Sequence, residues 1–531
     1  MSRASRVPRR TYPSDLSGQW RALQNDPLLA RFAASRERLA CDPYRPLYHF
    51  TSPENALNDP NGLCFWQGRW HLFYQGYPPE DPRQHWGHAV SDDLIHWQDL
   101  PYAIYPDPEE CCFSGATLVE PDRVLAMYHG TECGNMLAVS DDPLLLRWRK
   151  LTGGPVIPMR SADGVPLPYS VFDPCIWKKG EAYYALSGGT LPHPVTGRRT
   201  RAEFLFRSED LVHWTYLHPF LEGDGFGRPG DDGACPYFWP LGERHLLLHF
   251  SHMSGGKYLI GDYDRDRDVF RVCNGGSFNS GSWYAGGVHA PSAAPDGQGG
   301  VIAIWNLNVG KPTPGWDQVM SLPRRLTLTG AYRDELAIEP AGNTDALRTA
   351  HVHVGETALP AGREVVLDGV EGDALELRAV FDPRNVPALE LNVLRAPDRQ
   401  EVTRILFYRQ RGNTNWEMFD AMGWTGAHDS LLAVDATCAS QLPDVETRAP
   451  ETAALFVAPD EPLELRVFLD RSVLEVFANG RQCISQRVYP GRPDSRGVSV
   501  RSLGQDSRLL SLDAWRMQAI FPNLNDGGNP A

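Results

Sequence analysis

Short apolar runs that alternate with polar residues fill most of the chain from about residue 46 onward. Gly, Pro, Asn and Asp separate these runs, a pattern typical of antiparallel strands joined by turns. Residues 15–40 are the main helical candidate, and we expect them to lie in a peripheral segment. The pattern therefore predicts an all-β protein with a short helical N-terminal extension over residues 1–45.

A weak internal repeat runs through the first β-rich stretch. The segment SDDLIHW at 91–97 recurs at 140–148 and at 208–214, so the three copies start 49 and 68 residues apart. Each copy lies between two strand-like runs. Periods of about 40–50 residues, lengthened by insertions, are typical of four-stranded propeller blades. This stretch therefore has room for five or six blades, although a chance repeat of an Asp-rich turn is the simpler alternative.

The pattern breaks after residue 328, and residues 331–350 are polar and mixed. Strand signals then resume, for example at 376–381 and 463–468. The run at 472–480 ends in Asn-Gly, the strongest short hairpin signal. Alternation on this scale indicates antiparallel sheets with one solvated face. We therefore predict a C-terminal β-sandwich over residues 350–518.

Length and composition support this division. A chain of 531 residues exceeds the usual size of a single core, so two domains are expected. The 49 glycines and 44 prolines suit a turn-rich β protein. The formal charge of −15 argues against a nucleic-acid partner, because phosphate binding needs a basic surface.

The N-terminus is basic but lacks the apolar segment of a signal peptide, and no run of about 20 apolar residues suggests a membrane span. We therefore expect a cytoplasmic protein that binds no membrane. Its ten cysteines then read as reduced thiols, and the sequence contains no Cys-x-x-Cys pair that would suggest zinc. A homodimer formed through the sandwich is left open.

Two carboxylates stand where turn-forming residues meet a strand. Asp59 lies in the turn-like stretch NDPNG at 58–62, and Asp173 lies in FDP at 172–174. A propeller gathers the beginnings of its inner strands around a central channel, so the two can converge. The dipeptide alone is weak evidence, because Asp and Pro are also good turn residues. Asp-Pro occurs elsewhere too, at Asp26, Asp42, Asp81, Asp107, Asp142 and Asp382.

Five motifs strengthen the case because they occur together and in order. They are NDPNG at 58–62, WGHAVSDDLIHW at 86–97, CFSGAT at 112–117, VFDP at 171–174 and VFLDRSVLEVFANG at 467–480. As a set they resemble glycoside hydrolase family 32, the invertases, inulinases and levanases, over roughly residues 46–518. The resemblance implies a five-bladed β-propeller over 46–335 followed by the β-sandwich. It also implies retaining cleavage of β-fructofuranosides without a metal or other cofactor.

By position, Asp59 matches the family's nucleophile, and Asp173 matches the carboxylate that holds sugar hydroxyls and stabilises the transition state. A carboxylate can trap the anomeric carbon of a ketofuranoside as a covalent intermediate, because the sugar departs through an oxocarbenium-like state. We expect a small carbohydrate substrate in a compact, blind funnel. The side chains expected to hold it are Asn58, Gln75, Trp86, Phe113 and Ser114, with core packing as the alternative for the aromatic ones.

Two positions depart from the family pattern. Phe172 stands where the family has the Arg of Arg-Asp-Pro, which removes a bidentate polar partner. Ala234 stands where the family has the acid/base Glu of Glu-Cys-Pro. A methyl group cannot protonate a leaving alkoxide, and losing general acid catalysis typically costs about 10²–10⁴ in rate.

Either the enzyme is impaired or another acid has taken over. Asp232 is the first candidate, because two residues before position 234 in an extended strand it points to the same face. Asp231 is the second, reachable if Gly230 and Gly233 permit a bulge. The alternative for both is a solvated acidic turn, and weaker rivals as the acid are Glu203 and Glu222.

Three histidines at 245, 249 and 252 alternate like strand residues and lack the Glu of a His-Glu-x-x-His site, so strand positions, some facing the site, are favoured over a metal site. The sequence thus predicts a retaining glycosidase acting on a fructofuranoside. A non-catalytic sugar-binding protein on the same fold and a fructosyltransferase stay open as alternatives.

Overall fold

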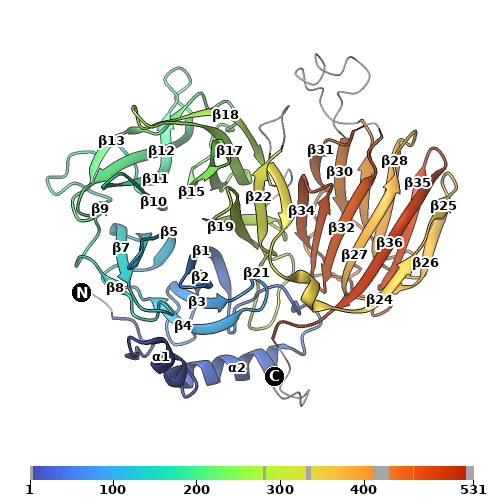
Figure 1. Ribbon diagram of the computed structural model, residues 1–531, viewed down its shortest axis with the longest axis horizontal. Helices are drawn as coiled ribbons and strands as arrows, with labels where there is room; N and C mark the ends of the chain where they lie inside the picture. The colour runs from blue at the N-terminus through green and yellow to red at the C-terminus, as the bar shows by residue number, and fades with distance from the viewer. Residues whose placement is uncertain are drawn as a thin grey trace.

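The computed structural model describes residues 4–278, 281, 283–329, 336–410, 430–458 and 460–521. A ring of small sheets lies beside a two-sheet sandwich, and two helices run along one edge of the ring (Figure 1). The predicted all-β class is confirmed, as is the propeller followed by a sandwich. The predicted propeller boundary at residue 335 lies outside the described residues.

The N-terminal extension contains α1 (Leu16–Leu23) and α2 (Pro27–Leu39). Each helix begins at an aspartate whose side chain accepts a backbone N–H of the first turn, Asp15 for α1 and Asp26 for α2. Pro27 at the first turn of α2 loses nothing, because its missing N–H would be unpaired there. Helix α2 packs beside β4, where Arg36 and Asp99 form an ion pair at 2.6 Å.

The propeller has five blades, numbered here in chain order, and all but one of their strand pairings are antiparallel. Blade 1 consists of β1 (Leu57–Trp66), β2 (Arg69–Gly76), β3 (His85–Ser91) and β4 (Gln98–Ile104). Blade 2 consists of β5 (Cys112–Val119), β6 (Val124–Gly130), β7 (Gly134–Ser140), β8 (Arg149–Lys150) and β9 (Ile157–Pro158). Blade 3 consists of β10 (Pro174–Lys179), β11 (Ala182–Pro192), β12 (Arg199–Ser208) and β13 (Thr215–Pro219).

The last two blades complete the ring. Blade 4 consists of β14 (Leu221–Glu222), β15 (Ala234–Leu241), β16 (Arg244–Ser251), β17 (Gly255–Asp264) and β18 (Val269–Ser277). Blade 5 consists of β19 (Val288–Pro295), β20 (Val301–Leu307), β21 (Val319–Met320), β22 (Arg324–Leu328) and β23 (Leu336–Pro340). Each inner strand contacts the inner strand of the next blade, and β19 closes the circle against β1.

The internal repeat occupies the same place in three blades: it joins β3 to β4, β7 to β8 and β12 to β13. In blade 1, Asp93 accepts the backbone N–H groups of Ile95 and His96. In blade 3, Asp210 does the same for the residues two and three positions on. The repeat is therefore a local turn that caps its own backbone with a carboxylate.

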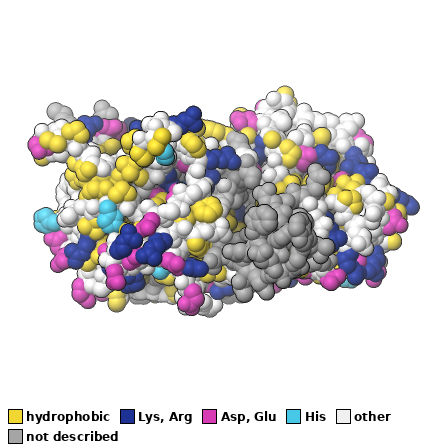
Figure 2. Space-filling view, turned by 90° about the horizontal axis from the view of Figure 1, so that it is seen from above, with side chains coloured by type: hydrophobic (Ala, Val, Ile, Leu, Met, Phe, Trp, Pro, Cys, Tyr) yellow, Lys and Arg dark blue, Asp and Glu magenta, His cyan; other side chains and the backbone are white. Residues whose placement is uncertain are grey.

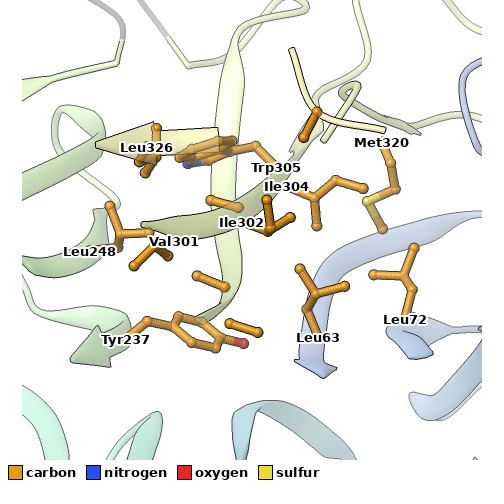
Figure 3. Packing of buried hydrophobic residues seen from close by; sticks show 14 of the residues in the cluster. Leu63, Leu72, Tyr237, Leu248, Val301, Ile302, Ile304, Trp305, Met320 and Leu326 are labelled. Carbon is orange, nitrogen blue, oxygen red and sulfur yellow. The ribbon is translucent and has the colours of Figure 1, made fainter. Parts of the chain in front are cut away.

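Apolar side chains from neighbouring blades interlock around the axis, and Figure 3 shows Leu63, Tyr237, Leu248 and Trp305 among them. Tyr237 of blade 4 also joins the other blades by hydrogen bonds. Its hydroxyl donates to the carbonyl of Gly115 in blade 2 at 2.8 Å and accepts the N–H of Gly62 in blade 1 at 3.2 Å. Burial and these bonds fix how the inner strands meet.

The C-terminal domain follows the short helix η1 (Thr344–Leu347) and packs one sheet on another. One sheet contains β24 (Arg348–Val354), β25 (Thr357–Leu359), β27 (Ala374–Asp382), β32 (Leu463–Asp470), β33 (Val473–Ala478), β34 (Gln482–Arg487) and β36 (Ser507–Met517). The other contains β26 (Glu364–Glu371), β28 (Ala388–Arg395), β29 (Thr403–Tyr408), β30 (Ser430–Asp435), β31 (Glu451–Leu455) and β35 (Gly497–Leu503).

The motif at 467–480 forms the hairpin of β32 and β33, and its polar residues hold the two domains together. Asp470 is completely buried and accepts the backbone N–H groups of Leu47 and Tyr48 at the start of the propeller. Arg324 of blade 5 donates to Ser485 of the sandwich at 2.6 Å. The motif is thus structural, and the two domains form a continuous body.

On the face seen in Figure 2, acidic and basic side chains mix over the propeller, and no large field of one sign appears there. A search of the described residues finds no helix with the length and apolar character needed to cross a bilayer.

Candidate functional site

Four of the five inner strands begin with an irregular register that re-aims their first side chains. Strands β1, β5, β15 and β19 each carry such a shift near their start. A β-bulge of this kind bends the strand and turns side chains that a regular ladder would point elsewhere. All four strands start toward the same end of the ring, so the re-aimed side chains meet on the axis.

The stretch NDPNG is not the turn before a strand that its composition predicts. Residues 58–62 already belong to β1, which is bulged on both sides of Pro60. Gly62 has φ +49°, and a Cβ there would lie 2.7 Å from Thr117 of blade 2. The turn-forming residues are therefore used inside the strand, where they allow the bulge and the close approach of the next blade.

Asp59 is nearly buried, with 8% of its surface exposed, and four blades supply its partners, among them Cys235 of blade 4. Its Oδ2 accepts the hydroxyl of Ser114 at 2.5 Å and the amide of Gln75 at 3.3 Å. The Nδ1 of His289 lies 3.1 Å from its Oδ1. Since these groups converge on both oxygens, the carboxylate is held in one orientation.

Burial works to raise the pKa of Asp59. The hydrogen bond and electrostatic attraction of His289, together with hydrogen bonds from Ser114 and Cys235, outweigh burial and hold the pKa below its usual value. Asp59 is therefore ionised at neutral pH, which is the state a carboxylate nucleophile needs.

Asp173 lies directly before β10 and is 3% exposed. Its Oδ2 accepts the backbone N–H of Cys235 at 3.0 Å, while its Oδ1 has no hydrogen-bond partner among the described residues. Burial and the nearby charge of Asp59 raise the pKa of Asp173 to about 7. A buried carboxyl oxygen without a partner is suited to bind a hydroxyl of a ligand.

The two aspartates meet at one side chain. The Sγ of Cys235 lies 3.5 Å from Asp59 and 3.4 Å from Asp173, and Cys235 has φ +50° at the bulge of β15. One carboxyl thus has a lowered pKa and its neighbour a raised one. Pairs of neighbouring titratable groups whose pKa values are shifted in opposite directions are typical of acid–base chemistry. We call Asp59, Asp173, Ser114, Cys235 and His289 the axial site.

The predicted substrate-binding residues divide into two groups. Ser114 and Gln75 belong to the hydrogen-bond network of Asp59, and Asn58 accepts the side-chain amides of Asn306 and Gln318, both at 3.2 Å. Phe113 lies at the rim, with its ring 6.1 Å from that of His129. The roles of these residues toward a sugar stay predictions.

Trp86 is placed differently. It is fully buried between the first two blades, and its indole N–H donates to the carbonyl of Phe113 at 2.9 Å. No part of the ring is free to stack on a sugar, because Phe73, Tyr128 and their neighbours cover it. The expected stacking role is therefore corrected to a supporting one, in which Trp86 holds the backbone beside Ser114.

The two departures from the family pattern lie in one apolar cluster. Ala234 is 1% exposed and packs with Cys235, Phe250 and Ala290. Phe172 and Trp283 cover this cluster from outside. The predicted loss of a guanidinium and of a carboxyl is thus one change in space, in which apolar contacts occupy the place of two charged groups.

The two acids proposed to replace the missing Glu have other partners. Asp231 is buried and accepts Ser251, Ser254 and the backbone N–H of Arg228. Although burial works to raise the pKa of Asp231, these hydrogen bonds hold it below its usual value, so a donated proton is disfavoured. Asp232 binds the side chain of His252 at 2.8 Å and its backbone N–H at 3.0 Å.

The weaker rivals, Glu203 and Glu222, differ from each other in burial. Glu203 of β12 is completely buried against Gly233, neither of its oxygens has a hydrogen-bond partner among the described residues, and burial raises its pKa to about 7. Glu222 is half-exposed and pairs with Arg267 at 3.0 Å. In the part of the chain that the structure describes, no group of three or more metal-ligating residues is present.

Sequence reasoning did not identify His289 and Cys235 as site residues, and it grouped His252 with strand histidines, some of them facing the site, whereas the structure places His252 in the turn after β16. His289, Cys235 and His252 all lie near the aspartates, yet each is separated from Asp59 by more than 170 residues. The one available signal was position: His289 and Cys235 stand near the starts of inner strands, as Asp59 does.

Sequence comparisons place the chain in a family. Residues 49–340 match the profile described as Glycosyl hydrolases family 32 N-terminal domain, and residues 343–516 match Glycosyl hydrolases family 32 C terminal. Fructan 6-exohydrolase of Beta vulgaris is 28% identical over 558 residues, which cover 91% of this chain and 88% of the relative. Levanase of Bacillus subtilis is 28% identical over 520 residues, covering 90% and 71%.

A solved structure agrees in fold. Fructan 1-exohydrolase IIa from Cichorium intybus superposes with a TM-score of 0.75 at 23% identity, over 90% of this chain and 98% of the other. Two adjoining family profiles account for nearly the whole propeller and sandwich, and so the chain belongs to family 32 of the glycosyl hydrolases.

Proposed function

We propose that the protein is a retaining glycoside hydrolase that acts on fructofuranosides, with Asp59 as the nucleophile. The observation that carries this proposal is the state of Asp59: it is ionised, held by Ser114 and His289, and placed beside a second carboxyl. Relatives named fructan 6-exohydrolase and levanase support a fructoside as substrate.

The chemistry follows from this geometry. An Asp59 oxygen attacks the anomeric carbon as the bond to the leaving oxygen breaks, and water later releases the sugar with retention. Asp173 offers its free oxygen to a sugar hydroxyl, and this contact steadies the ring as positive charge develops. The low exposure of both aspartates keeps bulk water from weakening these interactions.

The test is turnover of a substrate panel: sucrose, inulin-type and levan-type oligosaccharides, and difructose anhydrides. We expect fructose release from at least one, with a first-formed product of retained anomeric configuration by NMR. Asp59→Asn should lower kcat by about 10⁴-fold or more, as removal of an essential member of a catalytic unit does. Undiminished hydrolysis by Asp59→Asn, or an inverted product, would refute the assignment.

A non-catalytic sugar-binding protein is the second candidate, and Ala234 is the observation that favours it. It predicts that fructosides bind, as seen by calorimetry, while no member of the panel is cleaved. Transfer to a second sugar is the third: added fructosides would then be extended in preference to being hydrolysed.

We also propose a cytoplasmic location, which the ten free cysteines support because disulfides are rare in reducing compartments. Fractionation of cells that express the tagged protein tests it. A homodimer stays a prediction, for which light scattering of the purified protein is the direct measurement.

A further inference from the structure

The axial site lacks a proton donor at the position where the family carries one. Ala234 presents a methyl group inside an apolar cluster, and Asp231 accepts three hydrogen bonds, one from its own turn and two from the end of β16 and the turn that follows it. Asp232 is the remaining predicted acid, and both of its oxygens bind a single residue, His252. Of the pair formed by Asp232 and His252, the imidazole is therefore the group left free to reach the site, because both carboxylate oxygens are occupied.

His252 lies in the turn between β16 and β17 and is fixed there by three hydrogen bonds. Its Nδ1 and its backbone N–H both bind the carboxylate of Asp232, at 2.8 Å and 3.0 Å. Its carbonyl accepts the indole N–H of Trp283 at 3.0 Å. Since Asp232 accepts from Nδ1, a proton carried by Nε2 is available for transfer, and no described residue forms a hydrogen bond to Nε2.

The ring stands at the rim of the axial site. Its centroid is 5.0 Å from that of Phe250, 6.3 Å from that of Phe172 and 6.4 Å from that of Trp283. Phe250 and Trp283 also pack on His289, the partner of Asp59, at 4.2 Å and 4.9 Å. One layer of aromatic rings thus separates His252 from the group that holds the nucleophile, and 49% of the His252 side chain is exposed to solvent.

The charges that face His252 come from three elements. Its pKa is raised first by the hydrogen bond to Asp232, against a lowering by burial, and then by the charges of Asp232, Asp173 and Asp59. An imidazole of this kind carries its proton at neutral pH more readily than an isolated one.

We propose that His252, oriented by Asp232, donates the proton to the leaving oxygen in place of the carboxyl missing at position 234; this inference rests on the proposed glycosidase function. The proton moves from Nε2 to the glycosidic oxygen as the bond from that oxygen to the anomeric carbon breaks. The bonding pair stays with the oxygen, while an Asp59 oxygen forms the new bond to carbon. Neutral His252 then takes a proton from water, whose hydroxyl displaces Asp59 and restores both groups.

Two other acids could serve, and the structure favours His252 over both. Asp173 is 3% exposed, and its Oδ2 is held by the Cys235 backbone. Glu203 is fully buried behind Gly233, with the guanidinium Nε of Arg201 at 3.5 Å from its Oε1. His252 alone of the three combines exposure at the rim with a fixed orientation.

The test compares two substrates that differ in their need for an acid: an O-linked fructoside that the wild type cleaves, and β-D-fructofuranosyl fluoride, whose leaving group departs without protonation. His252→Ala should lower kcat/KM about 10²–10⁴-fold on the O-linked fructoside and leave kcat/KM on the fluoride near the wild-type value, because kcat/KM reports the first step and the fluoride needs no acid there. On the fluoride kcat should fall, because release of the sugar from Asp59 loses its base, and an undiminished kcat/KM also shows that the variant is folded.

Asp232→Asn tests the positioning role. A general acid loses activity as pH rises through its pKa, and loss of the carboxylate lowers the pKa of His252. The alkaline limb of kcat/KM on the O-linked fructoside should therefore move to lower pH, with no such movement for the fluoride.

The matched control is His213→Ala. His213 forms the same kind of bond to Asp210, at 2.7 Å, but lies exposed in the repeated turn of blade 3. This variant should behave as wild type on both substrates.

Equal effects of His252→Ala on kcat/KM for both substrates, or no effect on either, would overturn the inference. A loss selective for the O-linked fructoside in Glu203→Gln or Asp173→Asn, with His252→Ala unaffected, would move the role to that residue. Failure of the wild type on both substrates would instead refute the proposed function, and the inference with it.

Discussion

The starts of β1 and β15 are the same structural element in two blades, yet their chemistry is opposite. Both strands are inner strands with a bulge near the first residues. At β1 the bulge presents Asp59 to hydrogen-bond donors from four blades, whereas at β15 it presents Ala234 to an apolar cluster. The two strands share the β-bulge but differ in the side chain that it presents.

The comparison shows how a charged position can be given up without loss of the fold. Burying an ion pair carries a desolvation cost, and well-packed apolar groups of similar volume often replace such a pair with no loss of stability. Phe172 and Ala234 contact the same cluster, so a large ring and a small methyl group can share the space. A single substitution to a charged residue at position 172 or 234 would place its charge in this apolar cluster without the opposite charge at the other position.

The largest effect on stability is expected when a charged residue is placed at position 234 again. Ala234→Glu places a carboxyl among Cys235, Phe250 and Ala290, side chains that offer it no positive charge, and we expect the free energy of unfolding to fall by about 3–5 kcal/mol. Adding Phe172→Arg supplies the cation, so the double variant should lose less than the sum of the single changes by about 1–3 kcal/mol. Denaturant titration of all four proteins measures this coupling.

Phe172→Leu combined with Ala234→Glu is the control, because it removes the ring without adding charge. The loss of stability caused by Phe172→Leu should simply add to the loss caused by Ala234→Glu. Strict additivity with Phe172→Arg as well would mean that the two positions are not one site, contrary to the cluster that they share.

A smaller effect on the free energy of unfolding, on the order of a few kcal/mol, is expected from the ionisation of Asp173. The pKa of Asp173 is about 7 in the folded protein, above its unfolded value of about 3.9. The folded state therefore keeps a proton that the unfolded chain releases, and stability falls as pH rises from about 4 to about 7 and is lowest above that. Asn does not titrate in this range, so the free energy of unfolding of Asp173→Asn should rise relative to that of the wild type as pH increases over the same interval.

Asp231→Asn gives the opposite sign and serves as the internal comparison. The pKa of Asp231 is lowered in the folded protein, so its carboxylate stabilises the fold at pH values above the pKa of the unfolded chain. This stabilisation is lost as pH falls. Thermal unfolding at several pH values should show the two variants diverging from wild type in opposite directions. Parallel curves would contradict the placement of Asp173 beside a charged Asp59.

The two strand starts also show what the sequence could predict. The turn repeated in blades 1, 2 and 3 was visible because Asp93 and Asp210 bind backbone groups only two or three residues away. The aspartates at 59 and 173 could be identified through motifs around them. Such signals are local, and each survives in the linear order of the chain.

The rest of the site depends on groups that meet only after folding. His289 reaches Asp59 across 230 positions, and no pattern around it marks that contact. The NDPNG stretch was read as a turn because its residues favour turns, while in the structure tertiary pairing with β2 draws it into a bulged strand. The role of Asp232 likewise depends on His252, which lies twenty residues further on in another turn.

The smallest effect tests how the β1 side holds its nucleophile. Ser114→Ala removes the hydroxyl that donates to Asp59 and helps to hold its pKa low, so the pKa of Asp59 should rise and the acidic limb of kcat/KM should move to higher pH. We expect about a tenfold loss of kcat near neutral pH, in line with one hydrogen bond to a charged group. Ser292→Ala is the matched control, because this buried serine binds Leu63 and Tyr237 but no carboxylate. A pH limb that moves equally in both variants would trace the change to packing around the axis, and a limb that moves in neither would leave His289 as the group that sets the charge of Asp59.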